Sequence, residues 1–216
     1  MHVISLNVGG PRTVQWHGRT VRTSIWKGPV TGPHRVATLN IDGDQQSDLT
    51  VHGGPQKAVY AYPSEHYDYW RRALPGVELP WGAFGENLTT EGLSEVTVHI
   101  GDRFQIGSAE FQVTQPRMPC YKLGIRFNDD MMVKRFLESG RSGIYFSVLR
   151  VGEVGAGDAI TLLDHIEDGV SVSDIVSLYV GDLDDEELLR RAAIAPALPE
   201  HWKEIFRERL DGRDPS

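Results

Sequence analysis

Short apolar runs, separated by glycine and polar residues, make up the chain as far as about residue 165. HVISLNV predicts a first strand, and TVQWHGRTVRTSI predicts two strands joined by a turn at His17-Gly18. RVATLNIDGD predicts a strand that ends in a turn, and AVYAYP predicts another that stops at Pro63. Many short strands with few helices favour a closed or nearly closed β-barrel, because closure removes exposed sheet edges.

The second half of this region continues the strand pattern. VTVHIGDRFQIGSAEFQVTQ, residues 96–115, predicts three strands separated by turns at Gly101-Asp102 and Gly107-Ser108. GIYFSVLRVGEVGAGDAITLL closes the series of strands.

Helical spacing interrupts the strands twice. SEHYDYWRRAL predicts a helix with Ser64 as its N-cap, and DDMMVKRFLESG predicts one that Asp129 caps and Gly140 ends. The expected buried faces are Tyr67, Trp70 and Leu74 in the first helix and Met132, Val133, Phe136 and Leu137 in the second.

Beyond residue 165 glycine becomes rare and helical spacing takes over. SVSDIVSLY, DDEELLRRAAIA and LPEHWKEIFRERL predict three helices, the second capped by Asp184 and the third starting near Pro199. A unit of this size buries little core alone, so we expect it to pack on the barrel or on a second subunit. The predicted fold is α+β: a mainly β barrel domain over 1–165, followed by a three-helix unit over 170–213.

Charge and cysteine content narrow the classes of function. The net charge is −8, from 22 Lys+Arg against 30 Asp+Glu, which argues against a nucleic-acid polymer as partner. An anionic ligand would therefore need a local cluster of cations. One cysteine permits no internal disulfide, and MHVISLNVGGP resembles neither a signal peptide nor a membrane span. We expect a cytoplasmic protein without a membrane partner.

The single cysteine lies in QPRMPCYKLGIRF. By composition alone, Cys120 would be an inert buried thiol. Pro116 and Pro119, however, stiffen the chain around it, which predicts a rigid loop. Arg117 and Lys122 lie close enough in sequence to favour the thiolate. A thiolate can attack an electrophile or bind a soft metal.

DLTVHGGPQKAVYAY contains a candidate anion site. His52, Gly53 and Gly54 leave backbone N–H groups unobstructed, so they could form a nest, to which Lys57 adds a positive charge. The alternative is a tight turn before a strand, with His52 on the surface.

Three further segments carry polar groups between glycines. In WGAFGENLTTEGL, Asn87 offers a donor and an acceptor; the alternative is a loop with Glu86 in solvent. WKGPVTGPHR holds Lys27 in what could equally be a rigid turn. SGRSGIYF places Arg141 and Ser142 just past a predicted helix end, where Arg141 could instead interact with the helix C-terminus.

Several familiar sites are missing from the sequence. The histidines lack paired ligand spacing for zinc, and there is no phosphate loop or dinucleotide fingerprint. A cysteine–histidine hydrolase stays open, with His52 or His66 as the base.

Taken in order, these segments resemble the MOSC-domain family, most closely its YiiM-like subgroup. DLTVHGGPQKAVYAYP, PWGAFGENLTTEGL, GDRFQIG, QPRMPCYKL and SGRSGIYFSVL carry the resemblance, with a motif core over about 27–163. The last three helices are similar to the 3-alpha domain of that subgroup.

The resemblance implies a barrel that binds the molybdenum cofactor, a molybdopterin whose dithiolene holds the metal. It maps the family's thiolate ligand to molybdenum onto Cys120. The cofactor carries a phosphate and a pterin, so the remaining candidates are those that could hold these groups: Lys27, His52, Gly53, Gly54, Lys57, Asn87, Arg117, Arg141 and Ser142.

Related family members reduce N-hydroxylated compounds, and the subgroup is associated with detoxifying N-hydroxylated bases such as 6-hydroxylaminopurine. The expected function is therefore a molybdenum-dependent oxidoreductase that removes the oxygen of a small N–OH substrate at the metal. We find no flavin or nicotinamide fingerprint and expect no pyridoxal phosphate, so a separate reductase would supply the electrons. The alternatives are a cofactor carrier or sulfur-transfer module with a persulfide on Cys120, and a metal-free barrel that binds another anion. A homodimer is one arrangement that would cover the small helical unit.

Overall fold

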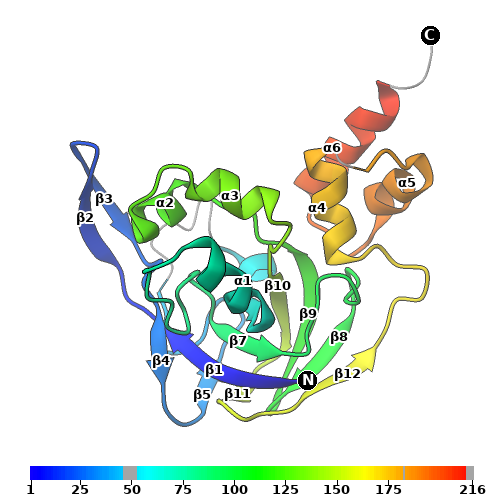
Figure 1. The fold of residues 1–216 in the computed structure, drawn as a ribbon. Helices are drawn as coiled ribbons and strands as arrows, with labels where there is room; N and C mark the ends of the chain where they lie inside the picture. The colour runs from blue at the N-terminus through cyan, green and yellow to red at the C-terminus, as the bar shows by residue number, and fades with distance from the viewer. Residues whose placement is uncertain (46–52, 182, 213–216) are drawn as a thin grey trace.

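A computed structural model describes residues 1–45, 53–181 and 183–212 (Figure 1). Runs of strands with a few helices between them form the first part, and helices alone form the last. The strands are β1 (His2–Val8), β2 (Arg12–Trp16), β3 (Arg19–Thr23), β4 (Gly28–Val30), β5 (His34–Val36), β6 (Val59–Pro63), β7 (Leu88–Glu91), β8 (Arg103–Ile106), β9 (Ala109–Pro116), β10 (Ile144–Arg150), β11 (Gly152–Val154) and β12 (Ile160–Asp164). The helices are η1 (Pro55–Lys57), α1 (Glu65–Ala73), α2 (Tyr121–Phe127), α3 (Met132–Glu138), α4 (Val172–Val180), α5 (Glu186–Ile194) and α6 (Glu200–Asp211). In the ranges that the structure describes, none of these helices has the length and apolarity needed to cross a bilayer.

Eight strands form one curled sheet, in the order β12-β8-β9-β10-β6-β7-β1-β4. Neighbouring strands are antiparallel except β6 and β7, which are parallel. Backbone bonds then join β1 to the segment that leads into β12: Val3 N–H donates to Asp158 O at 2.9 Å, and Gly157 N–H donates to Val3 O at 2.8 Å. The sheet thus closes on itself, and the α+β prediction of a barrel with a helical unit is confirmed.

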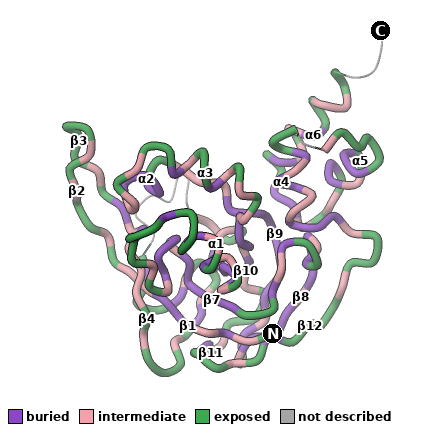
Figure 2. Tube along the Cα trace, in the orientation of Figure 1, coloured by how far each residue is buried: buried purple, intermediate pink, exposed green. Residues whose placement is uncertain are grey.

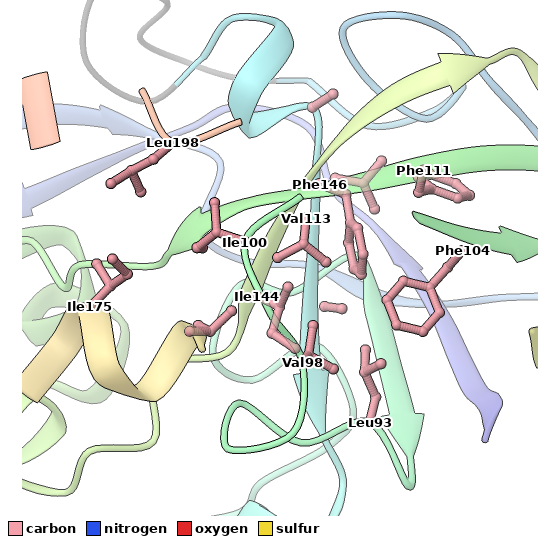
Figure 3. Close-up of a cluster of buried hydrophobic side chains, with 14 of the residues drawn as sticks. Leu93, Val98, Ile100, Phe104, Phe111, Val113, Ile144, Phe146, Ile175 and Leu198 are labelled. Atoms are coloured by element: carbon pink, nitrogen blue, oxygen red, sulfur yellow. The ribbon is translucent and has the colours of Figure 1, made fainter. Parts of the chain in front are cut away.

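The barrel core is continuous with the core of the last three helices. Phe104, Phe111 and Phe146 fill the barrel, while Ile175 and Leu198 extend the same cluster toward the helical unit (Figure 3). Buried residues lie in both β9 and α4, which contact each other (Figure 2). The helices therefore pack on the barrel, which is one of the two arrangements expected for a unit too small to hold its own core.

The hairpin prediction is confirmed, but one predicted strand is wrong. His17 and Gly18 both have positive φ, 49° and 74°, between β2 and β3, as two-residue hairpin turns require. Residues 96–100 form no strand. The carbonyl of Ser94 accepts from Thr97 N–H and Val98 N–H, which closes a turn there. Val98 and Ile100 are buried, whereas Val96 is 69% exposed, so the alternating apolar positions do not indicate a strand here.

One of the three predicted N-caps is confirmed, and the other two shift by one or two residues. Ser64 stands at the N-cap of α1, although its side chain makes no cap bond, and Met131 rather than Asp129 is the N-cap of α3. Asp129 Oδ1 still accepts from Met131 N–H at 2.9 Å. Asp185, not Asp184, caps α5 and accepts from Leu188 N–H at 3.0 Å.

Residues 117–120, where the prolines predicted a stiff loop, form neither helix nor strand, and α2, which the sequence did not predict, begins directly after them at Tyr121. The helix lasts two turns and ends at Asn128, whose φ of 50° is left-handed. Gly124 belongs inside it because an added Cβ would lie 3.0 Å from Asp129 O. The prolines therefore lead into a helix start, with Cys120 as the last extended residue before it.

Candidate functional site

An open pocket, enclosing about 690 Å³ of space that is partly open to solvent, lies where the barrel strands meet α2. Its wall holds Cys120 and four cationic side chains, although the protein as a whole is acidic. Segments far apart in the sequence contribute to it: Thr23, Ser24, Ile25, Lys27, Gln45, Lys57, Tyr60, Gly85, Asn87, Arg117, Met118, Cys120, Lys122 and Tyr145.

Cys120 lines this pocket and is half-buried. Its backbone is extended, with φ −125° and ψ 170°, and its carbonyl accepts from Leu123 N–H at 2.9 Å as α2 begins. The extended backbone places the thiol on the pocket wall. The thiol can therefore meet a ligand, unlike a cysteine sealed among aliphatic side chains.

Arg117 is a buried cation with a spare donor. The residue is 7% exposed, and its guanidinium lies 5.3 Å from the Tyr60 ring centroid and 5.0 Å from that of Phe136. Among the described residues, no acceptor bonds its Nη1. Burial opposes the charge, but Tyr60, Tyr145 and Cys120 together raise the pKa of Arg117 above its ordinary value. A buried N–H without an acceptor costs about 1–3 kcal/mol, so it points to a missing anionic partner.

Lys27 reaches the pocket as half of a buried ion pair. Its Nζ lies 2.6 Å from Asp44 Oδ2, and the two side chains are 10% and 1% exposed. Gly9 N–H donates to Asp44 Oδ1 at 3.0 Å, and Asn87 Nδ2 donates to Asp44 Oδ2 at 3.0 Å. Burial lowers the pKa of Lys27, and the neighbouring Asp44 partly offsets this. Asp44 could not be recognised from the sequence, because a polar residue in the turn NIDGD has no signal of its own.

Asn87 lines the pocket, but protein groups engage its amide. Its Oδ1 accepts from Tyr60 N–H at 3.1 Å, while its Nδ2 donates to Asp44. The residue was expected to contact the pterin. In the structure it ties the entry of β7 to β6 and steadies the Asp44 carboxylate.

The other predicted basic groups divide between the wall and its surroundings. Lys57 and Lys122 both line the pocket, and burial lowers the pKa of Lys57. Gly53 and Gly54 do not contribute to the lining; Gly54, at φ 98°, starts η1 and leads the chain to Lys57. His52 lies outside the described residues.

Arg141 and Ser142 are not part of the pocket wall. The Arg141 guanidinium lies over Tyr69, 3.8 Å from the ring centroid, and its Nη1 donates to Ser139 O at 2.8 Å. This is the contact with the end of α3 that the sequence left open. Ser142 Oγ donates to Gly143 O at 2.9 Å, and Ser142 O accepts from the hydroxyl of Tyr60 at 2.8 Å. Ser142 therefore fixes the position of Tyr60, which lines the pocket.

Glu86 was given a solvated alternative, and this is wrong, because the residue is 0% exposed. Its carboxylate accepts from the Tyr67 hydroxyl, from Gly82 N–H at 2.8 Å and from Thr89 Oγ1 at 3.0 Å. Phe84 N–H donates to its other oxygen at 3.1 Å. Burial raises the pKa of Glu86. Through these hydrogen bonds, Glu86 stabilises the segment next to the pocket wall.

Two histidine clusters lie away from the thiol. His66 Nε2 is 2.9 Å from Glu95, and no histidine in the described part of the chain lines the pocket, so His66 is not placed as a base for Cys120. His99, Asp102 and His165 offer potential ligand atoms within 4.8 Å of one another. Hydrogen bonds already engage these groups: the Asp102 carboxylate accepts from His99 N–H and Ile166 N–H and bonds the His165 ring. They join the segment leading to α4 to the barrel.

Comparison with known proteins identifies relatives of both the barrel and the helical unit. A model of the MOSC domain matches residues 48–161, and a model of the YiiM-like, 3-alpha helix domain matches residues 170–213. Uncharacterized protein YflK of Bacillus subtilis strain 168 is 40% identical over 97% of this chain and 94% of its own length. A protein named Reductase from Gibberella moniliformis is 35% identical over 68% of this chain, which spans 27% of the fungal protein.

The crystal structure of YiiM from Geobacillus stearothermophilus superposes with a TM-score of 0.80 at 35% identity, covering 97% of this chain and 98% of that one. The likeness thus extends over the barrel and the three helices together. By sequence and by fold, this chain belongs to the MOSC-domain family and carries the YiiM-like 3-alpha helix domain.

Proposed function

We propose that this protein is a molybdenum-cofactor-dependent reductase of small N-hydroxylated compounds, with N-hydroxylated bases such as 6-hydroxylaminopurine as the substrate class. MOSC-domain proteins are associated with the molybdenum cofactor, and the fungal relative is named a reductase. The observation that carries the proposal is local: a half-buried thiol shares a pocket with the buried guanidinium of Arg117, whose Nη1 has no acceptor in the part of the chain that the structure describes.

The residues in the pocket fit such a cofactor. Cys120 supplies the thiolate that a soft or borderline metal prefers. Arg117 Nη1 supplies a donor for an anionic group, and Lys57 and Lys122 add positive charge to the same wall. When bound, the cofactor supplies the two-electron chemistry that removes oxygen from an N–OH group.

The protein itself would bind and orient the cofactor and neutralise its negative charge. Cys120 would hold the metal, and Arg117, which packs against Tyr60 and Phe136, would hold an anionic group of the cofactor. Because the Arg117 guanidinium is already buried and packed, little ordering is needed when a ligand arrives. The open pocket leaves room for a small substrate. Electrons would come from a separate reductase.

Replacement of Cys120 tests the proposal directly. The protein would be prepared in a host that makes the cofactor, its molybdenum measured per chain, and 6-hydroxylaminopurine reduction followed with a supplied electron donor. We expect Cys120→Ala to lose at least 1,000-fold of the turnover, because the metal loses its protein ligand. Lys134→Ala on the exposed face of α3 is the matched control.

Activity retained in Cys120→Ala would contradict the proposal. A molybdenum-loaded wild-type protein that consumes no electrons would favour the carrier or sulfur-transfer alternative. A wild-type protein that binds no molybdenum in the same host would favour a barrel for another anion.

A further inference from the structure

Two of the cations that line the pocket, Arg117 and Lys27, are in opposite situations. Arg117 Nη1 finds no acceptor within residues 1–45, 53–181 and 183–212, whereas Lys27 faces a carboxylate at 2.6 Å. A lysine whose charge is already neutralised at that distance attracts an added anion weakly. It keeps N–H groups, however, and unlike arginine it gives up a proton readily when buried. Lys27 therefore suits proton transfer better than anion binding.

We propose that Lys27 donates a proton to the substrate oxygen and that Asp44 is the positioning residue that holds its ammonium group for this step. The inference rests on the proposed function. Reduction of R–NH–OH to R–NH₂ breaks the N–O bond, consumes two electrons and two protons, and releases water. The electrons come from the separate reductase. One proton passes from Lys27 Nζ to the departing oxygen, and solvent supplies the other proton and reprotonates Lys27.

Asp44 is built for a fixed position. Its carboxylate accepts from Lys27 Nζ, from Gly9 N–H and from Asn87 Nδ2, and Asn40 Nδ2 donates to its backbone carbonyl at 3.2 Å. Three donors from separate parts of the chain thus fix one buried carboxylate. A donor held by such a network stays within reach of one point in the pocket.

Neighbouring charges and burial determine the pH range over which Lys27 is protonated and can donate a proton. Asp44 and Glu86 favour its protonated form, and Arg117 opposes it. Burial lowers the pKa of Lys27, which makes it a stronger acid than a surface lysine. The other titratable lining groups are Cys120, Lys57, Lys122, Tyr60 and Tyr145. Burial raises the pKa of both phenols, so the tyrosines are weaker proton donors.

Three variants separate positioning from structure. Lys27→Arg keeps the charge but cannot release a proton, so we expect kcat to fall about 100-fold with molybdenum content unchanged. If the arginine side chain is too large for this buried position, Lys27→Gln replaces it as the test, and we expect the same fall in kcat. Asp44→Asn removes support for the charged lysine, so the alkaline limb of the kcat profile moves to lower pH. Lys134→Arg, from an exposed pair with Glu138, is the control and changes neither quantity.

A second readout uses the protein without turnover. In protein labelled with ¹³C at lysine Cε, the Lys27 signal, assigned as the one lost in Lys27→Gln, reports its titration. We expect it to titrate below the exposed lysines and to shift further down in Asp44→Asn. Wild-type activity in Lys27→Arg would overturn the inference and leave the proposed function standing. A Lys27 titration unchanged by Asp44→Asn would also overturn it. An inactive wild type would overturn the proposed function, while the titration would still test the Lys27–Asp44 coupling.

Discussion

Two of the buried ionisable groups of this barrel, Glu86 and Arg117, differ in their hydrogen bonds. The Glu86 carboxylate accepts from two side-chain hydroxyls and two backbone N–H groups, so both oxygens are satisfied. The Arg117 guanidinium is as deeply placed but leaves Nη1 without an acceptor among the described residues. A satisfied buried charge supports the fold, whereas an unsatisfied one lowers stability unless a ligand completes it. This contrast distinguishes Glu86, which stabilises the pocket wall, from Arg117, which is available to bind a ligand.

Removing the Arg117 charge is the strongest test of that contrast. We expect Arg117→Met to reduce molybdenum per chain about 10- to 100-fold, because the anionic part of the cofactor loses its buried donor. In the cofactor-free protein, the free energy of unfolding of Arg117→Met should equal that of the wild type or exceed it by up to about 1 kcal/mol. The reason is that the variant no longer buries an N–H without an acceptor. Elemental analysis and urea unfolding measure the two effects. A variant that keeps its molybdenum would contradict the assignment of Arg117.

Changing Glu86 should have the opposite outcome. Glu86→Gln turns an acceptor into a donor that faces N–H and O–H groups, so we expect the free energy of unfolding to fall by about 2 kcal/mol. Molybdenum bound per folded chain should stay the same, since Glu86 does not line the pocket. Glu204→Gln on exposed α6 is the control. Equal stability of Glu86→Gln and the wild type in urea would show that the network is dispensable.

The pH dependence of stability sharpens the same comparison. Burial raises the pKa of Glu86, so the folded protein holds this proton more tightly than the unfolded chain does. Between about pH 4, the pKa of an unfolded glutamate, and the raised folded pKa, this group's contribution to stability falls as pH rises. The stability difference between wild type and Glu86→Gln should therefore narrow with rising pH across that window. Urea unfolding at a series of pH values measures it, and a widening gap would reverse the assigned sign.

The smallest effect should come from one hydroxyl that bonds Glu86. Thr89 Oγ1 donates to Glu86 and accepts from Asn7 Nδ2 at 3.1 Å. Thr89→Val should lower the free energy of unfolding by about 1 kcal/mol, because a buried donor of Asn7 loses its acceptor. Thr161→Val on the exposed face of β12 should change it by less than about 0.5 kcal/mol. A neutral Thr89→Val would mean that the carboxylate needs only its other three donors.

The sequence was most informative where a local rule applied. The His17-Gly18 hairpin followed from turn chemistry, and the three C-terminal helices followed from their spacing and caps. It was least informative at α2, where prolines before Cys120 hid a short helix, and at 96–100, where alternating apolar residues belong to a turn. Both errors arise because burial by distant segments can override a short pattern.

Within the candidate site the same division holds. Cys120, Lys27, Lys57, Asn87 and Arg117 were singled out from residue type and motif, and the structure places all five on one pocket wall. Asp44 could not be found this way, because its role depends on Gly9, Lys27 and Asn87, which lie far from it in the chain. Arg141 and Ser142 resembled pocket residues, yet they bond neighbouring backbone groups.

The hairpin at His17-Gly18, the three C-terminal helices and the presence of one thiol among cations could be predicted from the sequence, because they depend on backbone preferences and side-chain chemistry that act over a few residues. Which cations meet that thiol, and which of them already has a carboxylate partner, were decided only when the sheet closed. Hydrogen-bond satisfaction is a property of groups brought together from distant segments, so no local pattern could distinguish Arg117 from Lys27.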